Sequence, residues 1–256
     1  MKISFCIITL NEEENLGRCL QSCHDLADEI LVVDSGSVDG TEAIARGYGT
    51  RWKHQEWLGY VGQKNLAISS AGNPWVFSLD ADEELSPMLR EEIRLIRDGP
   101  STGVAGYSMP RCVLYEGRWI RHGDWYPDRL VRLFQRDKAC FTGGRVHERL
   151  QLDGVVERLR GDLFHYSFKD SADHRERGRR YARLWAETQF ENGRRIGRWA
   201  PILHSIFRWF RCYLLRGGFL DGRQGWRIAQ INSAEVLLKY RLLYEMGLKG
   251  QPEQVP

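Results

Sequence analysis

The chain has 256 residues and a net charge of +3, with 37 lysines and arginines against 34 acidic residues. This length allows one full α/β domain with an appendage and excludes two large domains. No run of about 18 uncharged apolar residues occurs, so we expect no membrane-spanning helix. We also expect no cleavable leader, because the chain enters its first apolar segment directly. The six scattered cysteines lack metal-ligand spacing, which is typical of reduced, packed thiols.

Two apolar segments near the start of the chain predict strands that lead into helices. Residues 3–10 end in Asn11-Glu12-Glu13-Glu14, where Asn11 is expected to cap a helix whose first turn holds the glutamates. Residues 29–33 end in the Gly- and Ser-rich loop 34–41, which opens a second helix. Alternation of this kind predicts a mostly parallel sheet that binds its ligands at the carboxyl ends of its strands.

A third apolar segment, residues 75–79, ends in the acidic pair Asp80 and Asp82. Two carboxylates at the end of a buried strand suit Mg²⁺ or Mn²⁺, which would bridge the protein to a diphosphate. Taken alone, such a pair is also typical of turns and helix caps. The polar residues after the two earlier strands favour the metal-site interpretation, since all three strand ends are expected at one edge of the sheet.

These motifs resemble the family 2 glycosyltransferases of the GT-A fold, and among them the small bacterial β-glucosyltransferases of lipopolysaccharide core assembly (WaaE/KdtX-like). The matching segments cover the first two-thirds of the chain and are residues 8–13, 32–41, 62–65, 79–83, 126–134 and 146–148. The resemblance implies a Rossmann-like α/β fold, a mostly parallel mixed sheet flanked by helices, with a C-terminal helical extension. We expect a catalytic domain over 1–170, a basic helical extension over 171–248 and a tail over 249–256.

The resemblance also implies a site for a UDP-sugar and a divalent cation, Mg²⁺ or Mn²⁺. Asp82 is the expected metal ligand, and His165 is a second candidate ligand that fits equally well as a structural histidine. The residues expected to bind the nucleotide are Thr9, Leu10, Asn11, Glu12, Asp34, Lys64 and Asp80. Lys64 is the least certain of these on sequence, because a solvated lysine on a helix has the same pattern.

An acceptor hydroxyl loses a proton as it attacks, so the reaction requires a general base. Glu148 is the first candidate, although it has the alternative of pairing with a neighbouring arginine. Asp124 is the second, because the Glu-Asp pair that carries the base in many relatives has no clear copy here. Candidates for binding the acceptor sugar are Trp125, Tyr126, Arg129 and His147. Buried aromatic residues of a β-ribbon would give the same pattern.

Positive charge is concentrated near the C-terminus. Between Ser171 and Arg227 there are thirteen arginines and five acidic residues, a net +8, so the rest of the chain carries −5. A helix is predicted from Asp173 to about Asn192, and the apolar segment after it is interspersed with arginines. A basic amphipathic helix rich in Trp and Phe is typical of an anchor on an anionic membrane surface. The same pattern fits a helix that packs its aromatic residues on the catalytic domain. No nucleic-acid motif is present, so nucleic acid is not an expected partner.

The function predicted from the resemblance is an inverting, metal-dependent transfer of a hexose, glucose from UDP-glucose. The expected acceptor is a sugar of the lipopolysaccharide inner core or a similar lipid-linked glycan, and the expected location is cytoplasmic, peripheral on the inner membrane. One alternative is a different UDP-sugar, N-acetylglucosamine or galactose, on another glycan or a protein. A nucleotidyltransferase is disfavoured, because three glutamates after the first strand form a poor triphosphate cradle. A non-catalytic nucleotide-binding protein is the remaining alternative.

Overall fold

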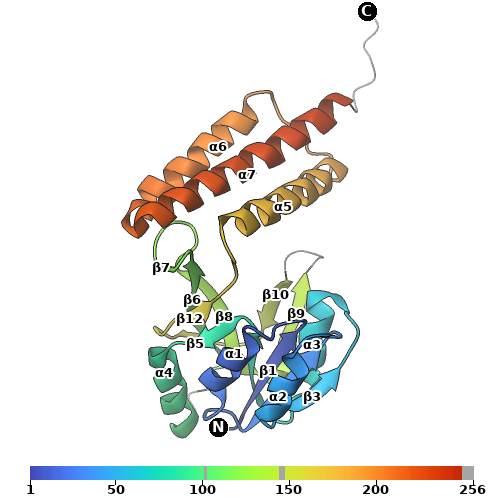
Figure 1. The fold of residues 1–256 in the computed structure, drawn as a ribbon, viewed down its shortest axis with the longest axis vertical. Helices are drawn as coiled ribbons and strands as arrows, with labels where there is room; N and C mark the ends of the chain where they lie inside the picture. Colours follow the sequence, from blue (N-terminus) through green and yellow to red (C-terminus); the bar gives the residue numbers. More distant parts are fainter. Residues whose placement is uncertain (101–102, 144–147, 250–256) are drawn as a thin grey trace, which may run out of the picture. The chain divides into compact units, whose positions relative to one another are not determined.

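The computed structural model describes residues 1–100, 103–143 and 148–249 (Figure 1). The chain forms two compact units. The first comprises Met1–Cys112 and Asp128–Tyr166, and the second comprises Val113–Pro127 and the chain from Ser167 onward. Residues 113–127, which the sequence analysis assigns to the catalytic domain, are therefore grouped with the C-terminal helices in the structure.

The first unit is built on a mixed sheet with helices on its faces (Figure 1). Its strands are β1 (Ile3–Thr9), β2 (Glu29–Asp34), β3 (Arg51–His54), β4 (Trp75–Asp80), β5 (Glu83–Leu85), β6 (Gly106–Tyr115), β8 (Asp128–Gln135), β9 (Ala139–Gly143), β10 (Glu148–Leu152), β11 (Val156–Arg158) and β12 (Leu163–His165). Its helices are α1 (Leu16–Cys23), α2 (Thr41–Gly47), α3 (Gly59–Ser70), α4 (Pro87–Asp98) and the short η1 (Arg136–Lys138).

The strand order β3-β2-β1-β4-β8-β6-β12-β5 divides the sheet into two parts. The strands from β3 to β4 are all parallel, whereas β8 pairs antiparallel with both β4 and β6. This confirms the predicted fold class of an α/β fold with a mixed sheet flanked by helices and followed by a helical region, although parallel pairing covers only part of the sheet, including β3, β2, β1 and β4 and the pair β11–β6. The three predicted strands are also confirmed and correspond to β1, β2 and β4.

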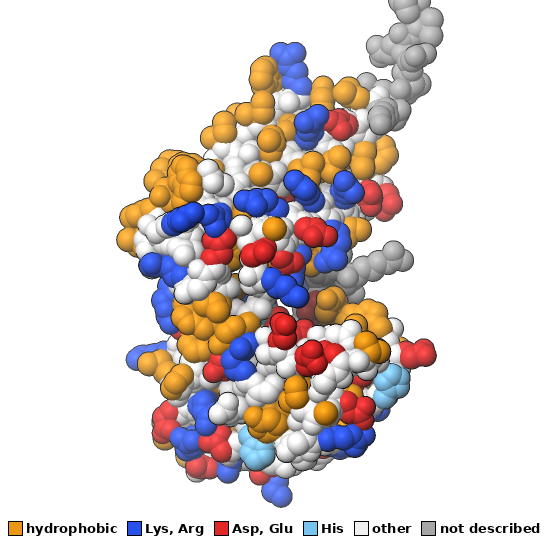
Figure 2. Space-filling model, viewed as in Figure 1, with side chains coloured by type: hydrophobic (Ala, Val, Ile, Leu, Met, Phe, Trp, Pro, Cys, Tyr) orange, Lys and Arg blue, Asp and Glu red, His pale blue; other side chains and the backbone are white. Residues whose placement is uncertain are grey.

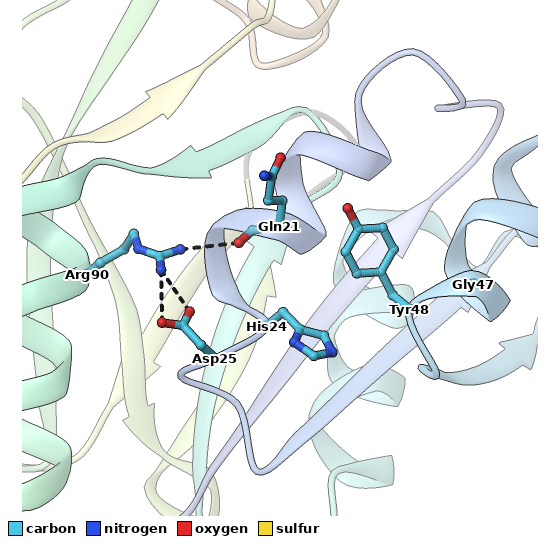
Figure 3. A pocket seen from close by; sticks show the side chains of 6 residues that line it. All are labelled: Gln21, His24, Asp25, Gly47, Tyr48 and Arg90. Carbon is cyan, nitrogen blue, oxygen red and sulfur yellow. Dashed lines mark hydrogen bonds and ion pairs between the residues drawn. The ribbon is translucent and has the colours of Figure 1, made fainter.

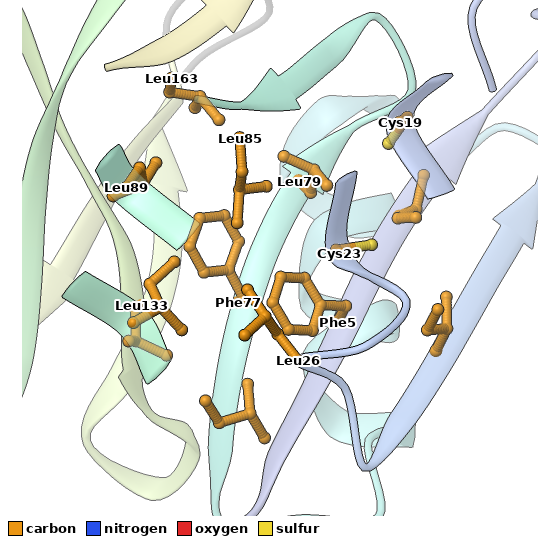
Figure 4. Close-up of a cluster of buried hydrophobic side chains, with 14 of the residues drawn as sticks. Phe5, Cys19, Cys23, Leu26, Phe77, Leu79, Leu85, Leu89, Leu133 and Leu163 are labelled. Carbon is orange, nitrogen blue, oxygen red and sulfur yellow. The ribbon is translucent and has the colours of Figure 1, made fainter. Parts of the chain in front are cut away.

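The core explains why these segments form interior strands. Strand β1 is buried along nearly its whole length, as expected for a parallel strand covered on both faces. Phe5 of β1 and Phe77 of β4 stack with ring centroids 4.9 Å apart (Figure 4). Cys19 and Cys23 of α1 complete this core, which confirms that they are packed thiols. Burial raises the pKa of the Cys23 thiol to about 12.

The predicted cap of the first helix is wrong. Helix α1 begins at Leu16, and the three glutamates precede it in a turn rather than forming its first turn. Asn11 adopts a left-handed backbone conformation with φ of 54°, which asparagine tolerates better than most residues. Its side chain accepts a hydrogen bond from Val38 N–H in the loop after β2, so it joins two loops instead of capping a helix.

The second unit consists mainly of helices. They are α5 (Ser171–Glu191), α6 (Ala200–Phe210), the π-helical turn η2 (Arg211–Leu215), η3 (Gly218–Asp221) and α7 (Gly222–Lys249), together with the short strand β7 (Arg118–Ile120). Helix α5 confirms the predicted helix, and the Asp170 carboxylate caps it by accepting hydrogen bonds from Ala172 N–H and Asp173 N–H. Across the described ranges, no helix combines the length and the apolar composition needed to cross a bilayer.

A buried histidine links α5 to the rest of this unit. His174 Nδ1 lies 3.2 Å from the Tyr115 hydroxyl, and its Nε2 lies 3.2 Å from Asn232 Oδ1 on α7. Burial is the main cause that lowers the pKa of His174 to about 4. The folded protein therefore holds this imidazole neutral at a pH where an unfolded chain would protonate it.

This histidine predicts a loss of stability in mild acid. An unfolded histidine binds its proton near pH 6.5 and His174 only near 4, so the free energy of unfolding falls as the pH decreases between these values. The full contribution is about 3 kcal/mol. Urea unfolding across this range is expected to show a shallower dependence on pH for His174→Gln than for wild type. His24→Gln, which changes an exposed histidine of the first unit, is the control; an unchanged slope in His174→Gln would contradict the assignment.

Candidate active site

The candidate site lies at the carboxyl edge of the three central parallel strands. Pairing of β1 with β2 places Thr9 opposite Asp34, and pairing of β1 with β4 places Ile8 opposite Asp80. Three residues predicted to bind the nucleotide, Thr9, Asp34 and Asp80, therefore lie at neighbouring positions of one sheet edge. In open α/β sheets this edge is where ligands bind.

The loops after β1 and β2 form a connected wall beside this edge. The buried Asp34 carboxylate accepts hydrogen bonds from the N–H groups of Gly36 and Ser37, at 2.8 and 2.9 Å. Glu12 N–H donates to Thr41 Oγ1 at 2.8 Å, so the two loops hold each other in place. Because the loops are cross-linked by hydrogen bonds, the wall is formed before any ligand arrives.

Two polar atoms near this wall are buried without a partner. Thr9 Oγ1 and Gln63 Oε1 have no hydrogen bond to any residue in the described ranges. The other end of the Gln63 amide donates to Ser35 Oγ at 3.0 Å, directly after Asp34. A buried polar atom without a partner is costly, so these two atoms are suited to a polar ligand such as a nucleoside. Leu10, by contrast, has an exposed side chain.

Asp80 is held by two cations. Arg132 Nη2 donates to Asp80 at 2.7 Å and to the fully buried Glu83 at 2.6 Å, and Lys64 Nζ lies 3.1 Å from Asp80 Oδ1. Burial alone raises the pKa of the Asp80 carboxyl, but the charges of Arg132 and Lys64 outweigh it, so the pKa lies well below its ordinary value. For Glu83 burial dominates, and its pKa is raised although Arg132 opposes the shift.

Asp82 faces a histidine on another strand. Strand β12 pairs antiparallel with β5, so that His165 lies opposite Glu83, and His165 Nε2 comes within 3.2 Å of Asp82 Oδ2. Both side chains keep some exposure, 25% for Asp82 and 13% for His165. Sequence proximity does not predict this contact, because the two residues are 83 positions apart.

The chemistry of this pair fits a divalent cation. A metal about 2.1 Å from each of two ligand atoms at a right angle separates those atoms by about 3 Å, close to the distance observed. No cluster of three or more His, Cys, Asp or Glu side chains suited to a metal is found in the described ranges. This pair would supply two ligands, as in Mg²⁺ sites where substrate phosphates and water complete the coordination.

Glu148 and Asp80 are linked by Lys64, which forms an ion pair with each carboxylate. Glu148 is the first residue of β10, and its carboxylate is 3.1 Å from Lys64 Nζ. Asn65 of α3 positions this hairpin, because its side-chain amide exchanges two hydrogen bonds with the backbone of Phe141 on β9. Lys64 is buried, so its ammonium is an internal bridge between two carboxylates rather than a solvated charge. His147, a predicted acceptor contact, lies outside the described residues.

Asp124 is not suited to the role of a base. It belongs to the second unit, where its buried carboxylate lies 3.0 Å from Arg208, 2.9 Å from Arg211 and 3.8 Å from Arg216. Three guanidinium groups surround its oxygens, which leaves them engaged in structural ion pairs. These ion pairs favour Glu148 over Asp124 as the candidate base.

The predicted acceptor contacts differ in their surroundings. Trp125 stacks on Phe168 with centroids 5.1 Å apart, inside the second unit, which supports the alternative of aromatic packing. Tyr126 lies in the same unit, with the Arg121 guanidinium 5.9 Å from its ring centroid. Arg129 is on β8 of the first unit and donates to the Leu159 carbonyl at 3.0 Å.

A separate pocket of about 330 Å³ lies in the first unit, away from these carboxylates (Figure 3). It is lined by Gln21, His24, Asp25, Gly47, Tyr48 and Arg90. Arg90 donates to both oxygens of Asp25, at 2.8 and 2.9 Å, and to the Gln21 carbonyl. Arg90 and Asp25 thus satisfy each other at one side of the pocket.

The sequence analysis missed three functional candidates, Arg132, Glu83 and Gln63. Arg132 and Glu83 had a usable signal: each is a charged residue in or next to an apolar strand, and a buried charge requires a partner. Gln63 had only its place in the matching segment 62–65 as a signal, because an amide on a helix is usually solvated.

Comparison with known proteins identifies relatives of this chain. Residues 4–149 match the model of the family Glycosyl transferase family 2. The chain is 31% identical to the lipopolysaccharide core biosynthesis glycosyltransferase LpsC of Rhizobium meliloti, over 98% of this chain and 96% of that protein. It is 28% identical to an uncharacterised glycosyltransferase of Rickettsia typhi, over 98% and 89% of the two chains.

Two solved structures are also similar. Glucosyl-3-phosphoglycerate synthase of Mycobacterium tuberculosis, in complex with Mn²⁺, UDP and glucosyl-3-phosphoglycerate, is 20% identical with a TM-score of 0.46, covering 65% of this chain and 72% of that one. TarS of S. aureus is 15% identical with a TM-score of 0.43, covering 99% and 93%.

Proposed function

Because this chain belongs to glycosyltransferase family 2, we propose that it transfers a hexose from a UDP-sugar, with inversion, to a sugar of a lipid-linked glycan. The proposed donor is UDP-glucose, and the proposed acceptor is the lipopolysaccharide inner core or a similar glycan. The name of the R. meliloti relative supports the acceptor. The observation that carries the proposal is the meeting of Asp80, Asp82, His165 and Glu148 around the end of β4.

The donor nucleoside would bind against the wall formed by the loops after β1 and β2. Asp34 would contact the uracil or ribose, and the buried hydroxyl of Thr9 would gain the hydrogen bond that it lacks. Leu10, Asn11 and Glu12 would line the nucleoside. The Asn11 side chain and the Glu12 N–H are engaged with the second loop, and the Glu12 carboxylate accepts from Asn15. Asp80, held in place by Arg132 and Lys64, would face the ribose side.

Asp82 and His165 would hold the divalent cation, Mg²⁺ or Mn²⁺. When bound, the cation neutralises the negative charge that develops on the leaving diphosphate. Of the two ligands, Asp82 supplies the negative charge and His165 a neutral nitrogen. The pairing of β12 with β5 fixes the backbone position of His165 beside Asp82.

Glu148 would act as the general base. As the acceptor oxygen bonds to the anomeric carbon, the bond from that carbon to the diphosphate oxygen breaks, and the hydroxyl proton passes to the Glu148 carboxylate. Direct attack from the face opposite the leaving group inverts the configuration. Lys64 would keep Glu148 in place through the 3.1 Å ion pair, and Arg129 is an acceptor-binding candidate of the same unit among the described residues.

Release of UDP tests the proposal without knowledge of the acceptor. Purified enzyme is incubated with UDP-glucose, UDP-galactose or UDP-N-acetylglucosamine, with and without Mn²⁺. We expect one sugar, UDP-glucose, to give metal-dependent UDP release, and Asp82→Ala to lower the rate by about 100-fold. Asp137→Ala, at an exposed aspartate of the same unit, is the matched control. If none of the three sugars gave UDP release and calorimetry showed no binding of UDP with Mn²⁺, the proposed donor class would be wrong.

The proposed place of action is the cytoplasmic face of an anionic membrane, where a lipid-linked acceptor is available. The net charge of +8 between Ser171 and Arg227 supports this location. An acceptor on a protein or on another glycan is the alternative, and it would need no membrane contact.

A further inference from the structure

Helix α6 has an exposed apolar face, whereas a helix that packs on its own domain normally buries that face. Five large apolar side chains, between 43% and 64% exposed, occupy one face: Ile202, Leu203, Ile206, Phe207 and Phe210. The inward side is mixed: the Ser205 hydroxyl exchanges hydrogen bonds with Ser233 on α7 and Arg208 pairs with Asp124, while Trp209 packs against Trp226. Since a surface helix normally buries its apolar stripe, the outer face of α6 is built to be covered.

The apolar face continues beyond the helix. Trp199 precedes α6, and the exposed side chains that follow are Leu214, Leu215, Phe219, Leu220 and Trp226. Eleven of the 24 large hydrophobic side chains that are exposed in the described ranges thus fall within residues 199–226. Figure 2 shows such side chains gathered over α6. Scattered exposed apolar residues are ordinary, but a contiguous patch marks an interaction surface.

The charge around this patch has one sign. Residues 192–220 contain six arginines and no acidic residue or lysine. Asp124 pairs with Arg208 and Arg211, and at 3.8 Å with Arg216, so its single negative charge offsets only one of these three positive charges. The other three precede α6: Arg194, Arg195 and Arg198. These three are exposed and form no ion pair with a carboxylate in the described part of the chain. Arg198 lies over the Trp199 ring, 4.8 Å from its centroid, at the border between charged and apolar surface.

We propose that the outer face of α6, with Trp199 and the residues of η2 and η3, docks on an anionic lipid membrane. The apolar side chains enter the boundary between headgroups and acyl chains, and the flanking arginines bind lipid phosphates. Helix α6 has 11 residues and is about 16 Å long, too short to cross a bilayer, so it lies in the plane of the surface.

A second copy of the chain fits this face less well. A symmetric dimer would bring the same patch of each copy together, and with it two sets of unpaired arginines. An anionic lipid membrane instead provides acyl chains for the apolar side chains and negatively charged headgroups for the arginines. This face of the protein would bring the enzyme to a lipid-linked acceptor, and in that respect the inference rests on the proposed function.

Co-sedimentation with vesicles tests the docking surface without donor or acceptor. Vesicles of phosphatidylcholine are compared with vesicles that also contain phosphatidylglycerol. Wild-type protein is expected to bind the anionic vesicles, and to bind less at high salt. The triple variant Leu203→Gln/Ile206→Gln/Phe207→Gln is expected to bind at least about tenfold more weakly. Arg198→Gln is expected to weaken binding about fivefold.

The matched control is Val38→Gln/Met88→Gln/Leu95→Gln, which removes three exposed apolar side chains from the first unit and should bind like wild type. Circular dichroism checks that each variant is folded. The inference would be overturned if wild-type protein did not co-sediment with anionic vesicles, or if the triple variant bound them as tightly as wild type. A dimer that dissociates in the triple variant would assign the face to a second copy instead. Failure of the proposed function would appear separately, in the UDP-release assay, which contains no vesicles.

Discussion

Replacing Arg132 by methionine is expected to lower the free energy of unfolding of the first unit by about 3–5 kcal/mol. Arg132 is buried and donates to Asp80 at 2.7 Å and to Glu83 at 2.6 Å. Methionine fills a similar volume but provides no charge, so Glu83 is left as a buried carboxylate without its main partner. Such an uncompensated charge is one of the few causes of losses this large.

Urea unfolding of Arg132→Met is compared with that of Arg129→Met, an exposed arginine of the same strand β8, which should change stability by less than about 1 kcal/mol. Adding Glu83→Gln to Arg132→Met removes the stranded charge and is expected to restore part of the lost stability. If the loss of unfolding free energy in the double variant equalled the sum of the losses in the two single variants, Glu83 and Arg132 would not be energetically coupled.

The sheet and the edge that carries the site could be predicted from sequence, because both depend on local patterns. Strands β1, β2 and β4 are short apolar segments with polar ends, and parallel pairing is enough to bring those ends together. The contact between Asp82 and His165 could be suspected only from the family resemblance. Its geometric cause, the antiparallel pairing of β12 with β5, joins residues too distant for any periodicity to reveal.

The differences between prediction and structure have specific physical causes. Asn11 has the composition of a helix cap, but its left-handed backbone and its bond to Val38 belong to a loop. Asp124 follows a glycine before an aromatic pair, a plausible place for a base, yet arginines more than 80 positions away surround its carboxylate. The pattern of α6 predicted an apolar face without saying which way it points. The exposure of the side chains on this face and the packing of Ser205 against α7 show that the face is outward.

Glu148→Gln is expected to lower the rate of donor cleavage by about 10²–10⁴-fold while leaving donor binding intact. The glutamine keeps the shape of the side chain but accepts no proton from an attacking hydroxyl or water. Lys64 retains its ion pair with Asp80 at 3.1 Å, so the nucleotide side of the site is preserved. UDP release gives the rate, and calorimetry with UDP and Mn²⁺ gives the affinity.

The combination of these two measurements separates a base from a structural ion-pair partner. If Glu148 only positioned Lys64, its replacement would disturb Asp80 and weaken UDP binding together with the rate. If Glu148 is the base, the rate falls and binding does not, because the proton is transferred only in the transition state. Glu157→Gln, at an exposed glutamate on β11, should leave both quantities unchanged. A wild-type rate in Glu148→Gln would require a different base for the reaction.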